Sequence, residues 1–274
     1  MEPLSLTVLL AMGTLAGAIN AAVGSGSLLT LPVLLALGIP PGVAVRTNTI
    51  GILFSTIGST YGYRRELAQE KGNLAPLVIV TALCATLGAL LLLVSPARAL
   101  DVVVPVLIVV ALAMVLFQKR LTALIRDGRE RRSAGRQGAV PQQGLSAEVA
   151  RSPYRGPGLI AAMGGASVYG GYFTAAQGVL YLGILGTFPG RSMGSVNSIK
   201  NLLSLVVNLA AAVVYVIAHF VLGVEVVWLA TAAIAVGALL DGYFGAHLAK
   251  RMPEWLLRGI IVVVALAALV RELL

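Results

Sequence analysis

Residues 4–38 read LSLTVLLAMGTLAGAINAAVGSGSLLTLPVLLALG, and this stretch decides the fold. Its first apolar run, 4–22, has the length of roughly 20 residues that crosses a hydrocarbon core about 30 Å thick. The cluster Gly24-Ser25-Gly26 then interrupts the helical pattern, and the following run, 27–38, is too short to cross alone. A short, interrupted apolar segment is a feature of transporter binding sites, provided that a matching segment occurs in the other half of the chain.

The composition of the whole chain suits lipid. Hydrophobic residues make up 58% and charged residues 11% of its 274 residues, whereas soluble proteins carry about 25% charged residues. We therefore expect an all-α, multi-pass integral membrane protein, with the lipid bilayer as a partner. The net charge of +9 comes mainly from residues between the apolar runs, which excludes a folded nucleic-acid surface. The apolar runs are 4–22, 27–38, 44–62, 74–94, 100–117, 157–175, 178–187, 192–218, 225–247 and 255–273.

The two halves of the chain resemble each other. At an offset of 149 residues, Thr47-Asn48-Thr49-Ile50 matches Val196-Asn197-Ser198-Ile199, and Gly88-Ala89-Leu90 matches Gly237-Ala238-Leu239. The short run 178–187 follows a second break, Ala175-Ala176-Gln177-Gly178, and so corresponds to 27–38. We predict a first transmembrane repeat over 1–117, a basic cytoplasmic linker over 118–156 with a charge of +6, and a second repeat over 157–274.

Charge counting bears on the topology. With straight crossings at both breaks, thirteen Lys and Arg residues share the side of the linker and six lie opposite; with hairpins the counts become sixteen and three, leaving out Lys200. The hairpin topology fits the positive-inside rule better and makes the repeats inverted, with the broken helices meeting near the midplane. Re-entrant and fully crossing pairs give the same count, so both stay open.

The breaks are candidate anion sites, because a helix N-terminus offers free N–H groups and the positive end of its dipole. The alternative is that the glycines serve only close helix packing. The candidate substrate-binding residues at the two breaks are Gly24, Ser25, Gly26, Ser27, Gln177 and Gly178.

A polar stripe marks the helix expected over 192–218. Positions i, i+3, i+4, i+7 and i+11 share one face, which we expect to face the bundle interior. They carry Asn197, Lys200, Asn201, Ser204 and Asn208. The first half repeats the stripe as Asn48, Gly51, Ser55 and Ser59. From these two sets the candidate substrate-binding residues are Asn48, Ser55, Asn197, Lys200, Asn201 and Ser204.

Lys200 is the one cation of the stripes, since Gly51 stands at its matching position. A lysine inside a membrane helix costs about 2.5 kcal/mol or more, which an anionic substrate would offset. Snorkelling to the interface and pairing with Asp241 are the alternatives. Asp241, well inside a helix, is our candidate for coupling to protons.

No cofactor, metal site or catalytic residue is expected. His219 and His247 have no neighbouring metal-ligand spacing, and no P-loop is present to supply energy from a nucleotide. The sequence predicts a secondary transporter of a small anion. An anion channel and an intramembrane lipid-phosphate hydrolase are the alternatives, although no base lies near Ser25, Ser27 or Ser204 in sequence. A homodimer is compatible with this reading.

Four segments carry a family resemblance: 17–32 and 37–48 in the first half, and 170–178 and 196–201 in the second half. The run Gly24-Ser25-Gly26-Ser27 up to Pro32, followed by Leu37-Gly38-Ile39-Pro40, resembles the opening signature of the TauE/SafE sulfite exporter family, also called the 4-toluene sulfonate uptake permease family. The resemblance implies transport of sulfite, sulfoacetate or another sulfonate across the bacterial inner membrane, in a direction that differs among members. The two breaks and the two polar stripes predict alternating access, and an inside-negative potential favours export of an anion. The chain departs from the family pattern at Ser25, Ser27, Ala-Ala-Gln-Gly in the second break, and Asp241, so substrate polarity and coupling ion do not carry over.

Overall fold

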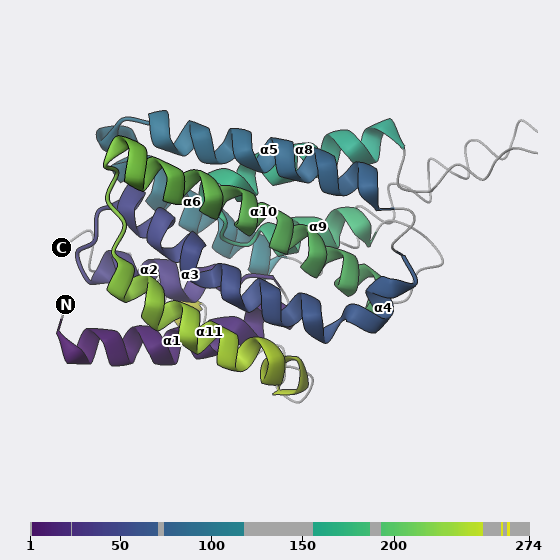
Figure 1. The fold of residues 1–274 in the computed structure, drawn as a ribbon, viewed down its shortest axis with the longest axis horizontal. Helices are drawn as coiled ribbons and strands as arrows, with labels where there is room; N and C mark the ends of the chain where they lie inside the picture. The colour runs from purple at the N-terminus through teal and green to yellow at the C-terminus, as the bar shows by residue number, and fades with distance from the viewer. Residues whose placement is uncertain are drawn as a thin grey trace, which may run out of the picture.

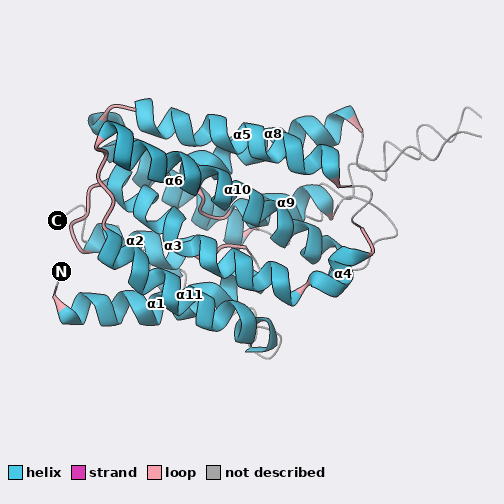
Figure 2. Cartoon of the chain, in the orientation of Figure 1, coloured by secondary structure: helices cyan, strands magenta, loops and turns pink. Residues whose placement is uncertain are grey.

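The computed structural model describes residues 2–22, 24–70, 74–117, 156–186 and 193–248, together with 259, 262 and 263. Over these residues the chain is helical throughout, with short loops between the helices (Figure 2). The helices are α1 (Pro3–Ala22), α2 (Ser27–Ala36), α3 (Pro41–Gly62), α4 (Arg64–Ala68), α5 (Ala75–Val94), α6 (Ala97–Leu116), α8 (Pro157–Phe173), α9 (Gln177–Leu185), α10 (Met193–Leu222) and α11 (Trp228–Leu248).

The long helices lie side by side in one bundle (Figure 1). Four helical stretches are long and apolar enough to cross a membrane: Pro3–Ala21, Ala75–Val94, Ala97–Leu116 and Gly194–Leu222. Large apolar side chains point outward from them, among them Leu83, Val102 and Phe220, which are 67%, 66% and 76% exposed. Lipid tails can cover such a surface at no cost, whereas water cannot. The expectation of an all-helical membrane protein is confirmed.

The first hairpin consists of α1 and α2, and its tip is residues 24–26. α1 runs in the same direction as α3, because Gly13 and Gly51 both face Ile234 while Asn20 further along α1 reaches Ser55. α2 runs the opposite way, since it ends only a short loop before α3 begins and its Thr30 contacts Asn48. With ten residues, or about 15 Å, α2 returns toward its starting side and does not cross.

The second hairpin consists of α8 and α9, and its tip is residues 174–176. Ser167 on α8 and Tyr181 on α9 bond each other at 2.8 Å, at nearly equal distances from the tip along the chain. α9 has nine residues and is also too short to cross. In Figure 1 α2 lies in the left part of the bundle and α9 in the right part. Both breaks therefore fold back, as the hairpin topology predicts.

Two glycine-mediated helix crossings hold the halves together. On α11, Gly237 lies so close to α1 that an added Cβ would be 2.3 Å from Leu10 O. On α5, Gly88 lies against α8 in the same way, 2.1 Å from Val168 O. Each crossing joins the first helix of one half to a helix of the other half, so neither half packs as a separate domain.

The helix boundaries match the apolar runs within a few residues, and the breaks lie where Gly24-Ser25-Gly26 and Ala175-Ala176-Gln177-Gly178 predict them. The linker 118–156 lies outside the described residues except for Gly156, and the run 255–273 lies outside them except for 259, 262 and 263. The same holds for Arg191 and for the side chains of Asp241 and His247. The domain boundaries therefore stay predictions.

Candidate functional site

The tips of the two hairpins touch. Gly178 N donates to Gly24 O at 3.2 Å, and a Cβ on Gly178 would lie 2.5 Å from Gly24 Cα. Gly24 also has φ +79°, which favours glycine. The backbone of the second tip is strained as well, because Thr174 and Ala176 have φ values of 68° and 57°. Left-handed conformations of residues other than glycine cost about 1–3 kcal/mol and occur preferentially at functional sites.

Lys200 of α10 holds the first tip. Its Nζ donates to Asn20 O at 3.2 Å and to Ala21 O at 3.1 Å, and the side chain is fully buried. Both carbonyls belong to the last turn of α1, where helix carbonyls have no partner within the helix and the dipole is negative. The structure therefore excludes the snorkelling predicted as one alternative. Pairing with Asp241 is not tested, because that side chain is not described.

The second tip is held by neutral hydroxyl groups. Thr49 of α3 bonds Thr174 at 2.8 Å, and Tyr169 OH donates to Ala175 O at 2.9 Å. Close by, Tyr215 OH of α10 donates to Gly171 O, in the last turn of α8, at 2.8 Å. The contacts cross over between the halves, since α10 of the second half binds the first tip and α3 of the first half binds the second tip.

α3 also fixes the inner faces of the first hairpin. Asn20 Nδ2 donates to Ser55 Oγ at 3.2 Å, and Thr30 Oγ1 donates to Asn48 Oδ1. All four side chains are buried. Hydrogen-bonded polar pairs inside an apolar bundle set the positions of α1 and α2 against α3 more narrowly than apolar packing alone would.

Polar atoms without partners gather on these same elements. Within the described part of the chain, seven buried side-chain N or O atoms have no hydrogen-bond partner, and all seven lie at the hairpin junction or on α3 and α10. They are Ser25 Oγ, Asn48 Nδ2, Gln177 Oε1, Asn197 Oδ1, Asn201 Nδ2, Ser204 Oγ and Asn208 Oδ1. An unpartnered buried polar group costs about 1–3 kcal/mol, so native structures rarely retain so many together without a ligand or water to bind them.

The stripe of α10 faces the interior, as its spacing predicts. Lys200, Asn201, Ser204 and Asn208 are all at most 3% exposed, and Asn197 is half-buried. Asn48, Ser55 and Ser59 of the first half are fully buried. Gly51 has a packing role, because an added Cβ would lie 2.8 Å from Ile234 Cγ2 on α11.

The predicted residues of the breaks divide into two groups. Gly24 and Gly178 contact each other, and the Gly178 N–H that was expected to meet an anion donates to Gly24 O instead. Gly26 packs against α1, where a Cβ would lie 2.2 Å from Ala16 O. Ser25 and Gln177 present unpartnered oxygens, while Ser27 is buried. Contact of any of these residues with substrate stays a prediction.

Sequence reasoning missed several residues that shape the site. Asn20, Thr30 and Thr174 bond the predicted residues or their neighbours. Thr49 could have been found, because it matches Ser198 in the repeat and both carry hydroxyl groups. The other three have no matching signal, since a hydroxyl or amide in an apolar run does not reveal its partner.

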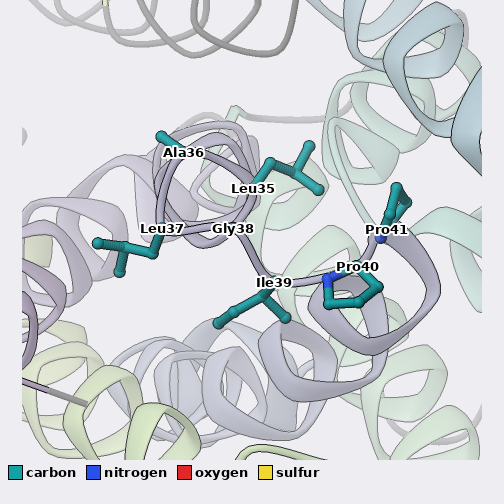
Figure 3. Close-up of a pocket in the computed structure, with 7 residues that line it drawn as sticks. All are labelled: Leu35, Ala36, Leu37, Gly38, Ile39, Pro40 and Pro41. Carbon is teal, nitrogen blue, oxygen red and sulfur yellow. The ribbon is translucent and has the colours of Figure 1, made fainter.

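A pocket of about 350 Å³ lies at the base of the first hairpin, at the opposite end of α2 from the tip. Its lining is one stretch from the end of α2 to the start of α3, Leu35–Pro41 (Figure 3). None of the unpartnered polar residues lines it. Among the described residues, no group of three His, Cys, Asp or Glu side chains could hold a metal ion. The junction of the tips therefore remains the better candidate site.

A helical membrane bundle with two hairpins whose return helices are too short to cross, and with buried polar residues at their junction, defines a transporter-like class of protein. The chain matches the family model "Sulfite exporter TauE/SafE" over residues 9–271, and it belongs to that family.

Two similar proteins are described as probable membrane transporters. The chain is 29% identical over 269 residues to "Probable membrane transporter protein YfcA" of Escherichia coli (strain K12), covering 96% of this chain and 88% of the relative. It is 24% identical over 260 residues to a "Probable membrane transporter protein" of Haemophilus influenzae, covering 95% and 91%. No solved structure matches the chain significantly. The protein is a multi-pass membrane transporter.

Proposed function

We propose that this protein is a secondary transporter that exports a small sulfur-containing anion, namely sulfite, sulfoacetate or another sulfonate, across the bacterial inner membrane. The observation that carries the proposal is the set of seven unpartnered buried polar atoms on α3, on α10 and on the two hairpins whose tips touch. An oxyanion accepts hydrogen bonds from amide and hydroxyl groups. Asn48 Nδ2, Asn201 Nδ2, Ser25 Oγ and Ser204 Oγ are available donors of that kind.

Lys200 adds positive charge to this site. Two of the three N–H groups of its ammonium bond the carbonyls of α1, which leaves one donor for the substrate. A charge-assisted bond to an oxyanion is about twice as strong as a neutral one. The remaining acceptors, on Gln177, Asn197 and Asn208, suit an ammonium or hydroxyl group elsewhere on an organic sulfonate.

Transport would proceed by alternating access in an inverted repeat. In Figure 1 α3 runs from left to right and α10 from right to left, and these are the matching helices of the two halves. The paired crossings at Gly88 and Gly237 support the same two-fold relation. Parting of the tips toward one side or the other would expose the polar junction. An inside-negative potential assists export of an anion by about 2.3 kcal/mol per charge per 100 mV.

Ligand-dependent thermal stabilisation tests the proposal. The purified protein is heated with sulfite, sulfoacetate, taurine, sulfate, thiosulfate or neutral controls, and a true ligand at 100 times its Kd stabilises by about 2.7 kcal/mol. Ser204→Ala removes a donor to the anion, and we expect roughly 10- to 100-fold weaker binding. Ser198→Ala is the matched control, because this buried serine of α10 already donates to Ser195 O at 2.8 Å. No stabilisation by any anion, or equal effects of the two variants, would refute the site.

Flux into proteoliposomes separates the alternatives. Trans-stimulated exchange of labelled sulfonate indicates a carrier, whereas flux that grows linearly with concentration indicates a channel. Release of phosphate from a lipid phosphate would indicate the hydrolase instead.

A further inference from the structure

The last turn of α1 has the chemistry of a cation site. Ile19 O accepts a bond from Gly24 N at 3.2 Å, and the next two carbonyls, of Asn20 and Ala21, both turn to Lys200 Nζ. Backbone carbonyls at the C-terminal end of a broken helix are the groups that bind Na⁺ or a proton in many secondary transporters. Here an ammonium group on α10 lies at that position.

We propose that Lys200 is a built-in cation that replaces a dissolved coupling ion at the tip of the first hairpin. Its partners in the structure are carbonyl oxygens with partial charges, and the side chain has no exposed surface. A buried ammonium is costly unless it is bonded, and the two carbonyls at the negative end of the helix dipole supply that compensation. Because the charge is covalently attached, it stays with the site throughout a transport cycle.

The first tip differs from the second in this respect. Gly51 stands where a second lysine would stand in the first half. The carbonyls near the second tip, Ala175 O and Gly171 O, receive neutral tyrosine hydroxyls from Tyr169 and Tyr215. Within the described residues, only the first tip therefore has a bonded cation.

This inference rests on the proposed function and deepens it, because an anion carrier with a tethered cation needs no Na⁺ at this position. The test itself requires no substrate. Lys200→Ala would leave two carbonyls facing a cavity of roughly the size of a short alkylammonium chain, and a dissolved cation could then bind there.

The experiment compares wild type, Lys200→Ala and Lys200→Met, purified and heated in choline, sodium, methylammonium or ethylammonium chloride. We expect the wild type to respond equally to all four salts. Lys200→Ala should unfold at a lower temperature in choline and regain roughly 5–10 °C in ethylammonium chloride. Lys200→Met fills the cavity with an uncharged chain, so ethylammonium should not stabilise it. Tyr169→Phe, which removes a neutral donor at the second tip, should not respond either.

Failure of the alanine variant to fold is covered by the design, because each variant is also expressed and extracted with ethylammonium present throughout. A folded yield of Lys200→Ala in ethylammonium but not in choline supports the proposal. Equal behaviour in both salts, or Lys200→Met as stable as the wild type, overturns it. If ethylammonium rescues the variant while the wild type binds no anion, the built-in cation stands and the proposed anion transport fails.

Discussion

The contact between the two tips makes Gly178→Ala a decisive substitution. A Cβ at this position would lie 2.5 Å from Gly24 Cα, 2.8 Å from Gly24 O and 3.0 Å from Gly24 C. Carbon atoms in contact normally lie about 3.5–4.0 Å apart, so the tips must separate by roughly 1 Å or more. All three atoms belong to the backbone, and no side chain can turn away to make room.

The cost follows from that displacement. Separation lengthens the 3.2 Å bond from Gly178 N to Gly24 O beyond hydrogen-bonding distance, which costs about 1 kcal/mol. Overpacking adds about 1–3 kcal/mol. We therefore expect a loss of roughly 2–4 kcal/mol, which corresponds to a fall in Tm of roughly 5–15 °C for a protein of this size.

The assay is thermal unfolding in detergent, followed by transport in proteoliposomes. Gly165→Ala is the matched control, because Gly165 lies on α8, is exposed, and would place its Cβ in open space. Alanine there should be neutral or stabilise by about 0.5–1 kcal/mol through helix propensity. If Gly178→Ala unfolds and transports like Gly165→Ala, the tips do not touch in the working protein, and the site argued from their contact is wrong.

Two further substitutions test how the halves are joined. Gly237→Ala would place a Cβ 2.3 Å from Leu10 O and should cost about 1–3 kcal/mol, seen as a lower Tm, whereas Gly158→Ala meets no neighbouring atom and should change little. Thr49→Val removes the hydroxyl that bonds Thr174 at 2.8 Å; it should cost about 1–3 kcal/mol of stability and slow transport. Thr49→Ser keeps the hydroxyl and should retain the wild-type Tm and flux. A valine variant with wild-type flux and Tm would contradict the role of this bond.

The sequence predicts the breaks and the stripes well, for physical reasons. Gly24-Ser25-Gly26 interrupts an apolar run, and a helix cannot continue through it at low cost. The i, i+3, i+4 and i+7 spacing on α10 assigns Asn197, Lys200, Asn201 and Ser204 to one face, whichever helix packs against that face. Both signals are local, so they need no knowledge of the partner helix.

The partners of these residues could not be predicted in the same way. Lys200 binds the carbonyl oxygens of Asn20 and Ala21, and every residue has a carbonyl, so the sequence contains no mark for this bond. The partners predicted for Lys200 were an anionic substrate and the Asp241 carboxylate, because a charged side chain can be recognised in a sequence. The tip-to-tip contact of Gly24 and Gly178 is likewise a meeting of two backbones. What remained hidden was therefore the backbone chemistry of the site.

The two hairpins reach the junction from unequal positions, and this inequality matters for the proposed mechanism. Gly13 on α1 faces Ile234, and Gly171 on α8 faces Ala85, the residue that matches Ile234 at the repeat offset. Nine residues of α1 follow Gly13, but only two residues of α8 follow Gly171. The first hairpin therefore extends roughly two turns of helix further past its crossing than the second. In the proposed mechanism, the opposite state would have the second hairpin extended and the first withdrawn.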